Sequence, residues 1–447
     1  MAAIALNSPI ASLAQLDLFR LPPTQGVVER VHYVDKFTST TDPNSNALDF
    51  TIQESGQDFI DLKRTQLEVK VRLLKDGTAN AGEPVPRVPI AIGDEVGPVN
   101  LFLQSLFSQV DVTINNVRVS ASSSNYAYRA YIYTALNYGM EVKDTWLESQ
   151  LYAKDESVMD STSPSSGDNR GLQERATYTD GGVTARLRGP LYSDVWQSKR
   201  WLIPGVTIKL TLRRNIDKFV LMGKPAKNNY GVEILEAKLN ICYCTLFAGA
   251  YNALEAALSL SAARYPLTRT IVKNYSLTKG EQSKVFEDIF AGKTPSKLVV
   301  CFVLDEAYNG AIGKNPFNFK HFDVSFMCVY CNGVPTPHKG YELIWNGVNK
   351  KNSDYVQAYS NLFTFANKKE SGSSIDIQRA DFCNGHALFV FNLDETIDAN
   401  TMPLYKAGNL RLEVRFKEKL PFAIQTIVYG QFPYVLSIDK NREIILD

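Results

Sequence analysis

The run LEVKVRLLKDG, residues 67–77, decides the fold class of this chain. Its apolar side chains Leu67, Val69, Val71 and Leu73 fall at every second position, charged side chains stand between them, and the run ends at an Asp-Gly turn. Successive side chains of a β-strand point to opposite faces, so the run predicts a strand with one buried face and one wet face. Strands of this kind are typical of antiparallel sheets.

The same alternation returns four times along the chain. These runs are residues 110–119, 206–213, 322–328 and 410–417. Asn115-Asn116 interrupts the first, and Asn332-Gly333 follows the third. Asn and Gly tolerate the positive φ angles of tight hairpin turns, so both sites predict a β-hairpin.

The order of features indicates a duplicated architecture. In each half a hairpin is followed by a Tyr-bearing helical stretch, at 126–138 and at 355–363, and then by a charged alternating strand. The hairpin turns lie 217 positions apart and the charged strands 204. A repeat at this distance predicts two similar domains and not a solenoid.

The expected fold is mainly β, with two tandem eight-stranded antiparallel jelly-roll sandwiches and a few short helices in the loops. Residues 161–182 are rich in Ser, Gly, Asp and Asn and predict a long exposed loop. The Ala-rich run AGAYNALEAALSLSAAR marks the junction between the halves. The expected segments are an N-terminal arm and lead-in at 1–47, a first jelly roll at 48–247, a short helical linker at 248–264, and a second jelly roll with a C-terminal strand at 265–447.

Composition and charge exclude several classes of protein. With 447 residues, 45% hydrophobic and 21% charged, the chain is globular and not disordered. A net charge of +1 gives no field for coating nucleic acid, so no direct, sequence-specific nucleic-acid partner is expected. No basic residue precedes Arg20, which argues against a secretory signal. Uncharged runs reach only 16 residues, so no transmembrane segment is expected.

No catalytic, cofactor-binding or metal site emerges from the motifs. The four His residues are isolated, and Cys328-x-x-Cys331 lies within an alternating strand without a second cysteine pair. Gly292-Lys293-Thr294 lacks the earlier glycine of a phosphate-binding loop. Asp144 with Glu148 could serve as a glycosidase pair, but charges on exposed faces are far commoner. We therefore expect no enzyme and no cofactor. Six Cys, mostly within apolar runs, favour synthesis in a reducing, intracellular compartment.

Several strings of residues, in order, resemble one protein family. The residues that carry the likeness are Asp61, Leu62, Asn100, Leu103, Ser105, Leu106, Phe107, Asn115, Tyr126, Tyr128, Arg129, Tyr131, Pro190, Asp194, Pro204, Gly205 and Phe219. They resemble the major capsid proteins of Polinton (Maverick) elements and adintoviruses, a double jelly-roll lineage related to virophage capsid proteins. The strings cover residues 48–222, and the second half resembles the family in layout, with weaker strings around Gly333 and Tyr341.

The resemblance implies a structural protein. It implies a homotrimer that forms a pseudo-hexameric capsomer, contacts neighbouring capsomers and tiles an icosahedral shell. It also implies a separate single-jelly-roll penton protein as partner, and a place in the virion after assembly inside the host cell. The N-terminal arm at 1–19 and the segment at 438–446 are the candidates for contacts between subunits.

Other readings of the sequence stay open at this point. One is a carbohydrate- or receptor-binding β-sandwich, spike-like or lectin-like, in which the tyrosines of 126–138 would stack on sugars or bases. Against it, Tyr side chains also suit protein–protein contacts or the rim of a sandwich. The remaining readings are a glycan-active enzyme and the smaller vertex protein of such a virus, which would need only one jelly roll.

Overall fold

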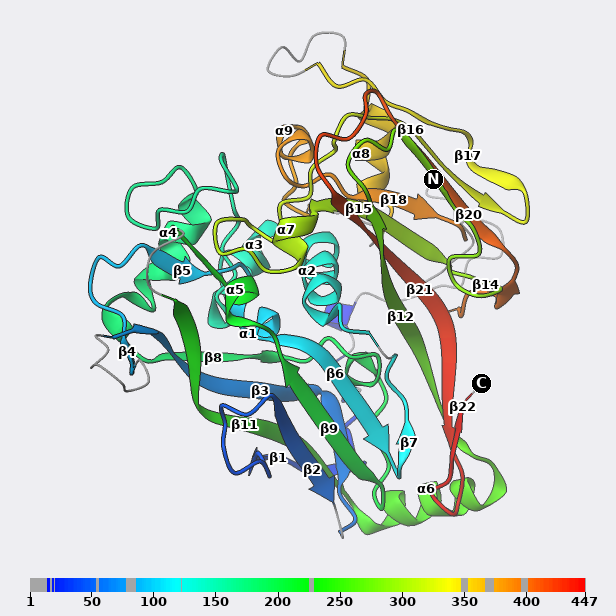
Figure 1. Cartoon of the computed structure of the whole chain (residues 1–447). Coiled ribbons are helices and arrows are strands. Elements are labelled where there is room, and N and C mark those ends of the chain that lie inside the picture. The colour runs from blue at the N-terminus through cyan, green and yellow to red at the C-terminus, as the bar shows by residue number, and fades with distance from the viewer. Residues whose placement is uncertain are drawn as a thin grey trace.

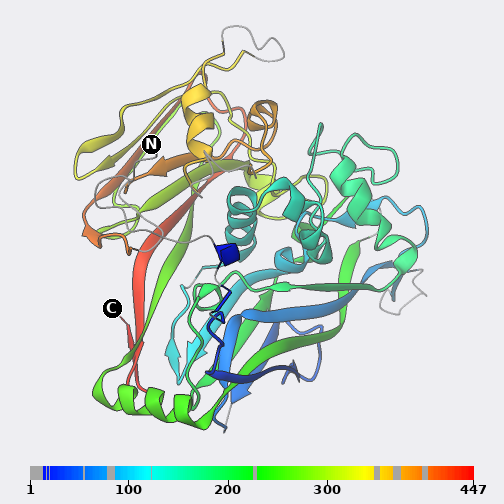
Figure 2. The ribbon, with the colours of Figure 1, turned by 180° about the vertical axis from the view of Figure 1, so that it is seen from behind.

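Two sets of antiparallel sheets, one from each half of the sequence, lie side by side in the computed structural model (Figure 1). The structure describes residues 14–16, 18–19, 21–53, 56–77, 86–121, 123–224, 229–346, 353–365, 374–394 and 401–446. Helix α6 (Ala248–Leu260) joins the two sets at one end. Seen from behind, helix α2 (Tyr126–Asn137) lies between them (Figure 2).

The first set is a sandwich of two sheets with short additions. One sheet has the order β1 (Val28–Phe37), β11 (Tyr230–Leu246) and β3 (Phe59–Asp76). Strands β8 (Ala185–Pro190) and β4 (Arg87–Pro89) both pair with β3 along different parts of its length. The other has the order β2 (Ala47–Gln53), β9 (Thr207–Arg214), β6 (Phe107–Ile114), β7 (Val117–Arg118). A small ribbon pairs β5 (Val96–Pro98) with β10 (Leu221–Gly223).

The second set repeats this order strand for strand. One sheet runs β12 (Ala263–Leu277), β21 (Ile424–Ile438), β15 (Lys297–Leu304), β18 (Phe389–Asn392), with β22 (Ile444–Leu446) beside β21. The other runs β13 (Ser283–Phe286), β20 (Leu410–Phe416), β16 (Val324–Cys331), β17 (Val334–Glu342), and a ribbon pairs β14 (Lys293–Thr294) with β19 (Lys406–Ala407). Eight strands of each half therefore take equivalent places in two sheets. The prediction of two eight-stranded antiparallel jelly rolls is confirmed.

The remaining helices are short and lie in the loops. They are α1 (Phe102–Ser105), α3 (Met140–Lys143), α4 (Arg170–Thr177), α5 (Asp217–Val220), α7 (Asp305–Tyr308), α8 (Val356–Leu362) and α9 (Arg379–Cys383), with 3-10 turns at Ala14–Leu16, Trp146–Gln150, Asp180–Gly182 and Val195–Gln197. Helices α2 and α8 confirm the two predicted Tyr-bearing helical stretches. The expectation of an exposed loop at 161–182 holds for 161–168 but is wrong for 170–177, where α4 forms and buries Leu172 and Arg175.

Both predicted hairpin turns are confirmed. Asn115 and Asn116, with φ of 45° and 67°, connect β6 to β7. Asn332 and Gly333, with φ of 50° and 83°, connect β16 to β17 in the equivalent place. Two consecutive positive φ angles match the right-handed twist of the flanking strands, which is why two-residue hairpins favour Asn and Gly there.

Strand alternation predicts the core well, with one exception. The four apolar side chains of 67–73 are fully buried, as the pattern predicts. In β16 the alternation of 322–328 predicts that Val324 and Phe326 share the buried face, and this is wrong for Phe326. A register shift against β20 between these residues turns Met327 and Val329 inward, and the Arg415 guanidinium lies 4.9 Å from the Phe326 ring centre. One extra residue in a strand exchanges its two faces.

Candidate functional site: the junction between the two jelly rolls

Tyrosines of α2 form an aromatic core with the second jelly roll. The Tyr131 ring stacks on Phe317 with centroids 4.3 Å apart, and Tyr128 stacks on Tyr308 at 5.6 Å. Phe219 meets Tyr128 edge-on at 5.8 Å. Burial raises the pKa of Tyr128 and of Tyr131 above the ordinary phenol value. These rings are closed off inside the molecule, so they are not an open stacking platform for sugars or bases.

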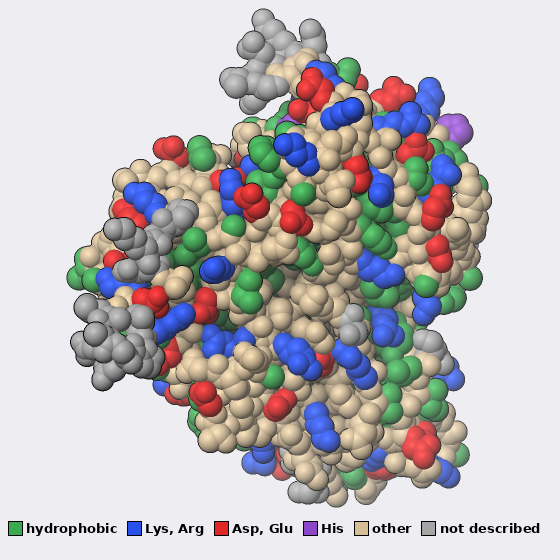
Figure 3. Space-filling view, in the orientation of Figure 1, with side chains coloured by type: hydrophobic (Ala, Val, Ile, Leu, Met, Phe, Trp, Pro, Cys, Tyr) green, Lys and Arg blue, Asp and Glu red, His purple; other side chains and the backbone are tan. Residues whose placement is uncertain are grey.

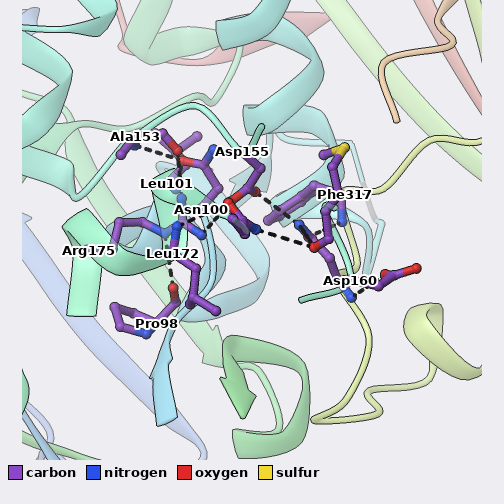
Figure 4. Close-up of polar contacts among 12 residues, drawn as sticks. Pro98, Asn100, Leu101, Ala153, Asp155, Asp160, Leu172, Arg175 and Phe317 are labelled. Atoms are coloured by element: carbon purple, nitrogen blue, oxygen red, sulfur yellow. Dashed lines mark hydrogen bonds and ion pairs between the residues drawn. The ribbon is translucent and has the colours of Figure 1, made fainter. Parts of the chain in front are cut away.

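A buried ion pair of the first roll lies at the same junction (Figure 4). Arg175 of α4 donates from Nη2 to Asp155 Oδ1 at 2.7 Å, and both side chains are almost completely shielded from solvent. Arg175 also donates to the carbonyls of Pro98 and Ala153 at 3.0 and 2.6 Å. The other carboxylate oxygen of Asp155 accepts from Asn315 Nδ2 of the second roll at 3.0 Å. All three guanidinium nitrogens and both carboxylate oxygens of the pair therefore have hydrogen-bond partners, as a buried charge requires.

Asp160 extends this network toward the second roll. Its two carboxylate oxygens accept from the Asn315 backbone N–H at 3.1 Å and from Lys320 Nζ at 2.8 Å. Burial works against the charged form, but the hydrogen bonds from Lys320 and Asn318 hold the pKa of Asp160 below its usual value. Asp160 therefore stays ionised and ties its loop to residues 315–320.

Two lysines of the first roll, Lys143 and Lys154, bind a segment of the second through ion pairs and a hydrogen bond. Lys154 Nζ lies 2.8 Å from Asp381 and 3.3 Å from Asp376. Lys143 Nζ is buried and donates to the Ile375 carbonyl at 2.6 Å and to the Ala135 carbonyl at 3.0 Å. Burial lowers the pKa of Lys143 to about 8. These contacts fix residues 375–381 against the first roll.

Arg129 and Asp194 join the edge of β12 to the first roll. Arg129 Nη2 lies 2.5 Å from Asp194 Oδ1, and the same oxygen accepts the Thr270 backbone N–H at 3.0 Å. Near the start of the same helix α2, the Tyr126 hydroxyl donates to Gln104 Oε1 at 2.6 Å and accepts the Tyr192 N–H at 3.1 Å. Asp194 therefore contacts both rolls, through Arg129 of the first and the Thr270 N–H of the second.

The C-terminal turn closes the far end of the junction. Arg442 donates from Nε to the Pro204 carbonyl at 2.9 Å and from Nη2 to Glu255 of α6 at 2.7 Å. Its own carbonyl accepts from Asn115 Nδ2 at 2.7 Å. Gly205, with φ of 80°, lies directly beneath the Arg442 side chain. The segment at 438–446 thus contacts its own chain, whereas most of the arm at 1–19 lies outside the described residues.

The residues of the family resemblance fall into two groups. At the junction lie Asn115, Tyr128, Arg129, Tyr131, Asp194, Pro204, Gly205 and Phe219. Inside the first roll lie Asp61, Leu62, Asn100, Leu103, Ser105, Leu106, Phe107, Tyr126 and Pro190. Asp61, for example, accepts from Trp201 Nε1 at 3.0 Å. The first group lies where the two rolls meet, and some of its members, such as Arg129 with Asp194, also contact each other within the first roll.

Sequence reasoning missed the polar half of the junction. Most of its residues lie in loops with no periodicity, namely Lys154, Asp155, Asn315 and Arg442, and Arg175 lies in the short helix α4. The stretch 153–160 does bring several charged residues of the network, Lys154, Asp155 and Asp160, close together in the sequence of the first half. It does not identify partners more than 100 positions away in sequence.

The side chains that could ligate a metal ion are dispersed in the described part of the chain. No three His, Cys, Asp or Glu side chains gather there as metal ligands would. Cys328 and Cys331 both lie on β16. Glu148 accepts from the Tyr178 hydroxyl, and it borders with Asp144 an open hollow of about 440 Å³ that Lys154 and Arg170 also line. No helix among the described residues has the length and apolar character needed to cross a bilayer.

The strand order and the junction together define a double jelly-roll protein. No protein-family model matches the chain. Solved structures share the fold over nearly the whole chain: the Sputnik virophage structure (TM-score 0.60, 13% identity, 100% of this chain and 94% of that one) and the mavirus major capsid protein (TM-score 0.56, 11% identity, 100% and 97%). The Faustovirus major capsid protein matches with a TM-score of 0.55 and 10% identity, over 95% and 92%.

One curated relative is similar in sequence. It is an uncharacterised protein of Caenorhabditis elegans, 26% identical over 410 residues, which cover 89% of this chain and 93% of that protein. The solved structures above belong to virus capsids and not to enzymes.

Proposed function

We propose that this chain is the major capsid protein of a Polinton-like element or a related DNA virus, and that it has no enzymatic activity. The observation that carries the proposal is the same eight-stranded unit built twice and locked together by a buried junction. Three such chains carry six similar units, so a homotrimer presents six near-equivalent edges to its neighbours. A closed ring of this kind leaves no unpaired interface within the capsomer.

The comparisons support two parts of this proposal. The mavirus and Faustovirus major capsid proteins and the Sputnik virophage structure share the fold over 92% or more of each chain. The relative in Caenorhabditis elegans supports an element carried in an animal genome. Acidic and basic side chains are interspersed on the face in Figure 3, which suits a shell protein better than a nucleic-acid coat.

Assembly and localisation belong to the same proposal. The trimers tile an icosahedral shell, a single-jelly-roll penton protein fills the vertices, and the product is a virion assembled inside the host cell. The segment boundaries at 47, 247 and 264 are proposed as the limits of arm, first roll and linker.

The test is the oligomeric state of the purified full-length chain. Light scattering is expected to give the mass of three chains, and negative-stain electron microscopy is expected to show hexagonal particles that form sheets or shells on concentration. A chain that stays monomeric at all concentrations and binds glycans on an array would refute the capsid role in favour of a lectin-like protein.

A further inference from the structure

Strand β1 leaves an apolar face open at the edge of the first jelly roll. Among the described residues it pairs with β11 along one edge and with no strand along the other. Val31, Tyr33 and Phe37 lie on one face of the strand and are 41%, 52% and 58% exposed. Asp35, which lies on this face between Tyr33 and Phe37, is paired with Lys238 of the neighbouring β11 at 2.7 Å. Proteins rarely leave a long apolar edge strand uncovered, because it pairs readily with other chains.

The equivalent strand of the second roll is covered, and the first roll covers it. Tyr265 of β12 is only 4% exposed, since its hydroxyl accepts the Ile203 N–H at 3.1 Å and donates to the Trp201 carbonyl at 3.2 Å. Arg200 Nη1 donates to the Arg264 carbonyl of β12 at 2.5 Å. All three covering residues lie in the loop between β8 and β9.

The second roll has a loop in the matching place, and two of its large apolar side chains are exposed. This loop lies between β18 and β20, and Leu404 and Tyr405 in it are 71% and 62% exposed. Leu404 precedes the first residue of β20 by six positions, as Trp201 precedes the first residue of β9. Met402 of the same loop lines an open hollow together with Pro266 of β12 and Val435 of β21. Each loop thus lies near the larger sheet of its own roll, the loop of the first roll through the hydrogen bond from Trp201 to Asp61 of β3.

We propose that β1 of one copy docks against residues 402–405 in the second roll of a neighbouring copy. The contact between copies would repeat the contact within the chain, with Leu404 and Tyr405 covering Val31 and Tyr33 as Trp201 and Ile203 cover Tyr265. Because the two surfaces differ, the contact is head-to-tail, and such contacts close into a ring when the rotation allows. The inference rests on the proposed capsid function and names the surfaces that its trimer uses.

Engineered cysteines test the contact directly. Chains carrying Tyr33→Cys are mixed with chains carrying Leu404→Cys under mild oxidation, and a disulfide-linked pair is expected on a non-reducing gel. A chain carrying both substitutions is expected to give covalent rings of three. Each single variant alone is the control, as is the unsubstituted chain, whose six cysteines are all buried or half-buried.

Charge substitutions give the second test. Tyr33→Asp and Leu404→Asp are each expected to weaken trimer formation at least tenfold in light scattering, because each buries a charge in an apolar contact. Val334→Asp is the matched control, since Val334 is 65% exposed at the tip of the β16–β17 hairpin. The melting temperature of each variant shows whether its fold is intact.

The outcomes separate this inference from the proposed function. If the unsubstituted chain forms trimers, and the Asp variants trimerise equally well without any cross-link in the mixed cysteine pair, the docking surface is wrong while the capsid role stands. If the unsubstituted chain never associates, both are wrong.

Discussion

Removing the carboxylate of Asp155 should be among the most destabilising single changes in this chain. Asp155→Ala leaves the Arg175 guanidinium buried beside two carbonyls with no counter-charge, and it deprives Asn315 of its acceptor. Breaking one partner of a buried pair costs about 3–5 kcal/mol. For a domain of this size each kcal/mol lowers the melting temperature by about 2–4 °C, so we expect a loss of roughly 6–20 °C.

Calorimetry of three variants checks this magnitude. Asp155→Asn keeps an oxygen for Arg175 and loses only the charge, so its melting temperature should fall between those of Asp155→Ala and the unsubstituted chain. Lys224→Ala removes an exposed ion pair with Glu95, 3.8 Å long, and should cost less than about 1 kcal/mol. The reasoning is refuted if Asp155→Ala and Lys224→Ala shift the melting temperature equally.

Three further changes probe the junction and its tyrosines. Tyr131→Ala should destabilise the chain by about 3–5 kcal/mol in denaturant unfolding, because it opens a cavity against Phe317. Tyr131→Phe keeps the stacked ring and should cost far less. Equal losses of stability for the two variants would contradict the stacking argument. Arg442→Ala should speed hydrogen exchange in the C-terminal turn and in the hairpin at Asn115, and unchanged exchange would show that the turn is held by other contacts. Burial raises the pKa of Tyr429 to about 12, above the phenol value near 10, so the folded state keeps a proton that the unfolded chain loses. The contribution of this proton to stability is complete below pH 10 and is lost as the pH rises to 12. Tyr429→Phe should therefore make alkaline unfolding less steep, as followed by tyrosinate absorbance.

Much of the fold could be predicted from local patterns. Residues 67–73 place their side chains on alternate faces whatever lies around them, and Asn115-Asn116 and Asn332-Gly333 favour the same backbone conformation in any hairpin. The order of these features was enough to predict the duplication. The pattern failed in β16, because a register shift beside Val324 depends on the partner strand and leaves no mark in the alternation.

The junction could be predicted only in part. The tyrosines of α2 are visible in the sequence as a cluster, but an isolated tyrosine cluster suits a ligand platform, an interface or a core equally well. Phe317 and Tyr308, which lie more than 170 positions further on, decide between these roles by burying the rings. The sequence offers no periodic signal for such pairings.

By itself, the sequence determined the strand faces, the hairpin turns and the twofold repeat, because these depend on side-chain alternation and on backbone preferences within a few residues. Only the tertiary structure decided what α2 packs against, that Asp155 and Arg175 form a buried pair linked to Asn315, and that β12 is covered while β1 is not. Those contacts join residues far apart in the chain, and their free energy exists only when both rolls are folded and side by side.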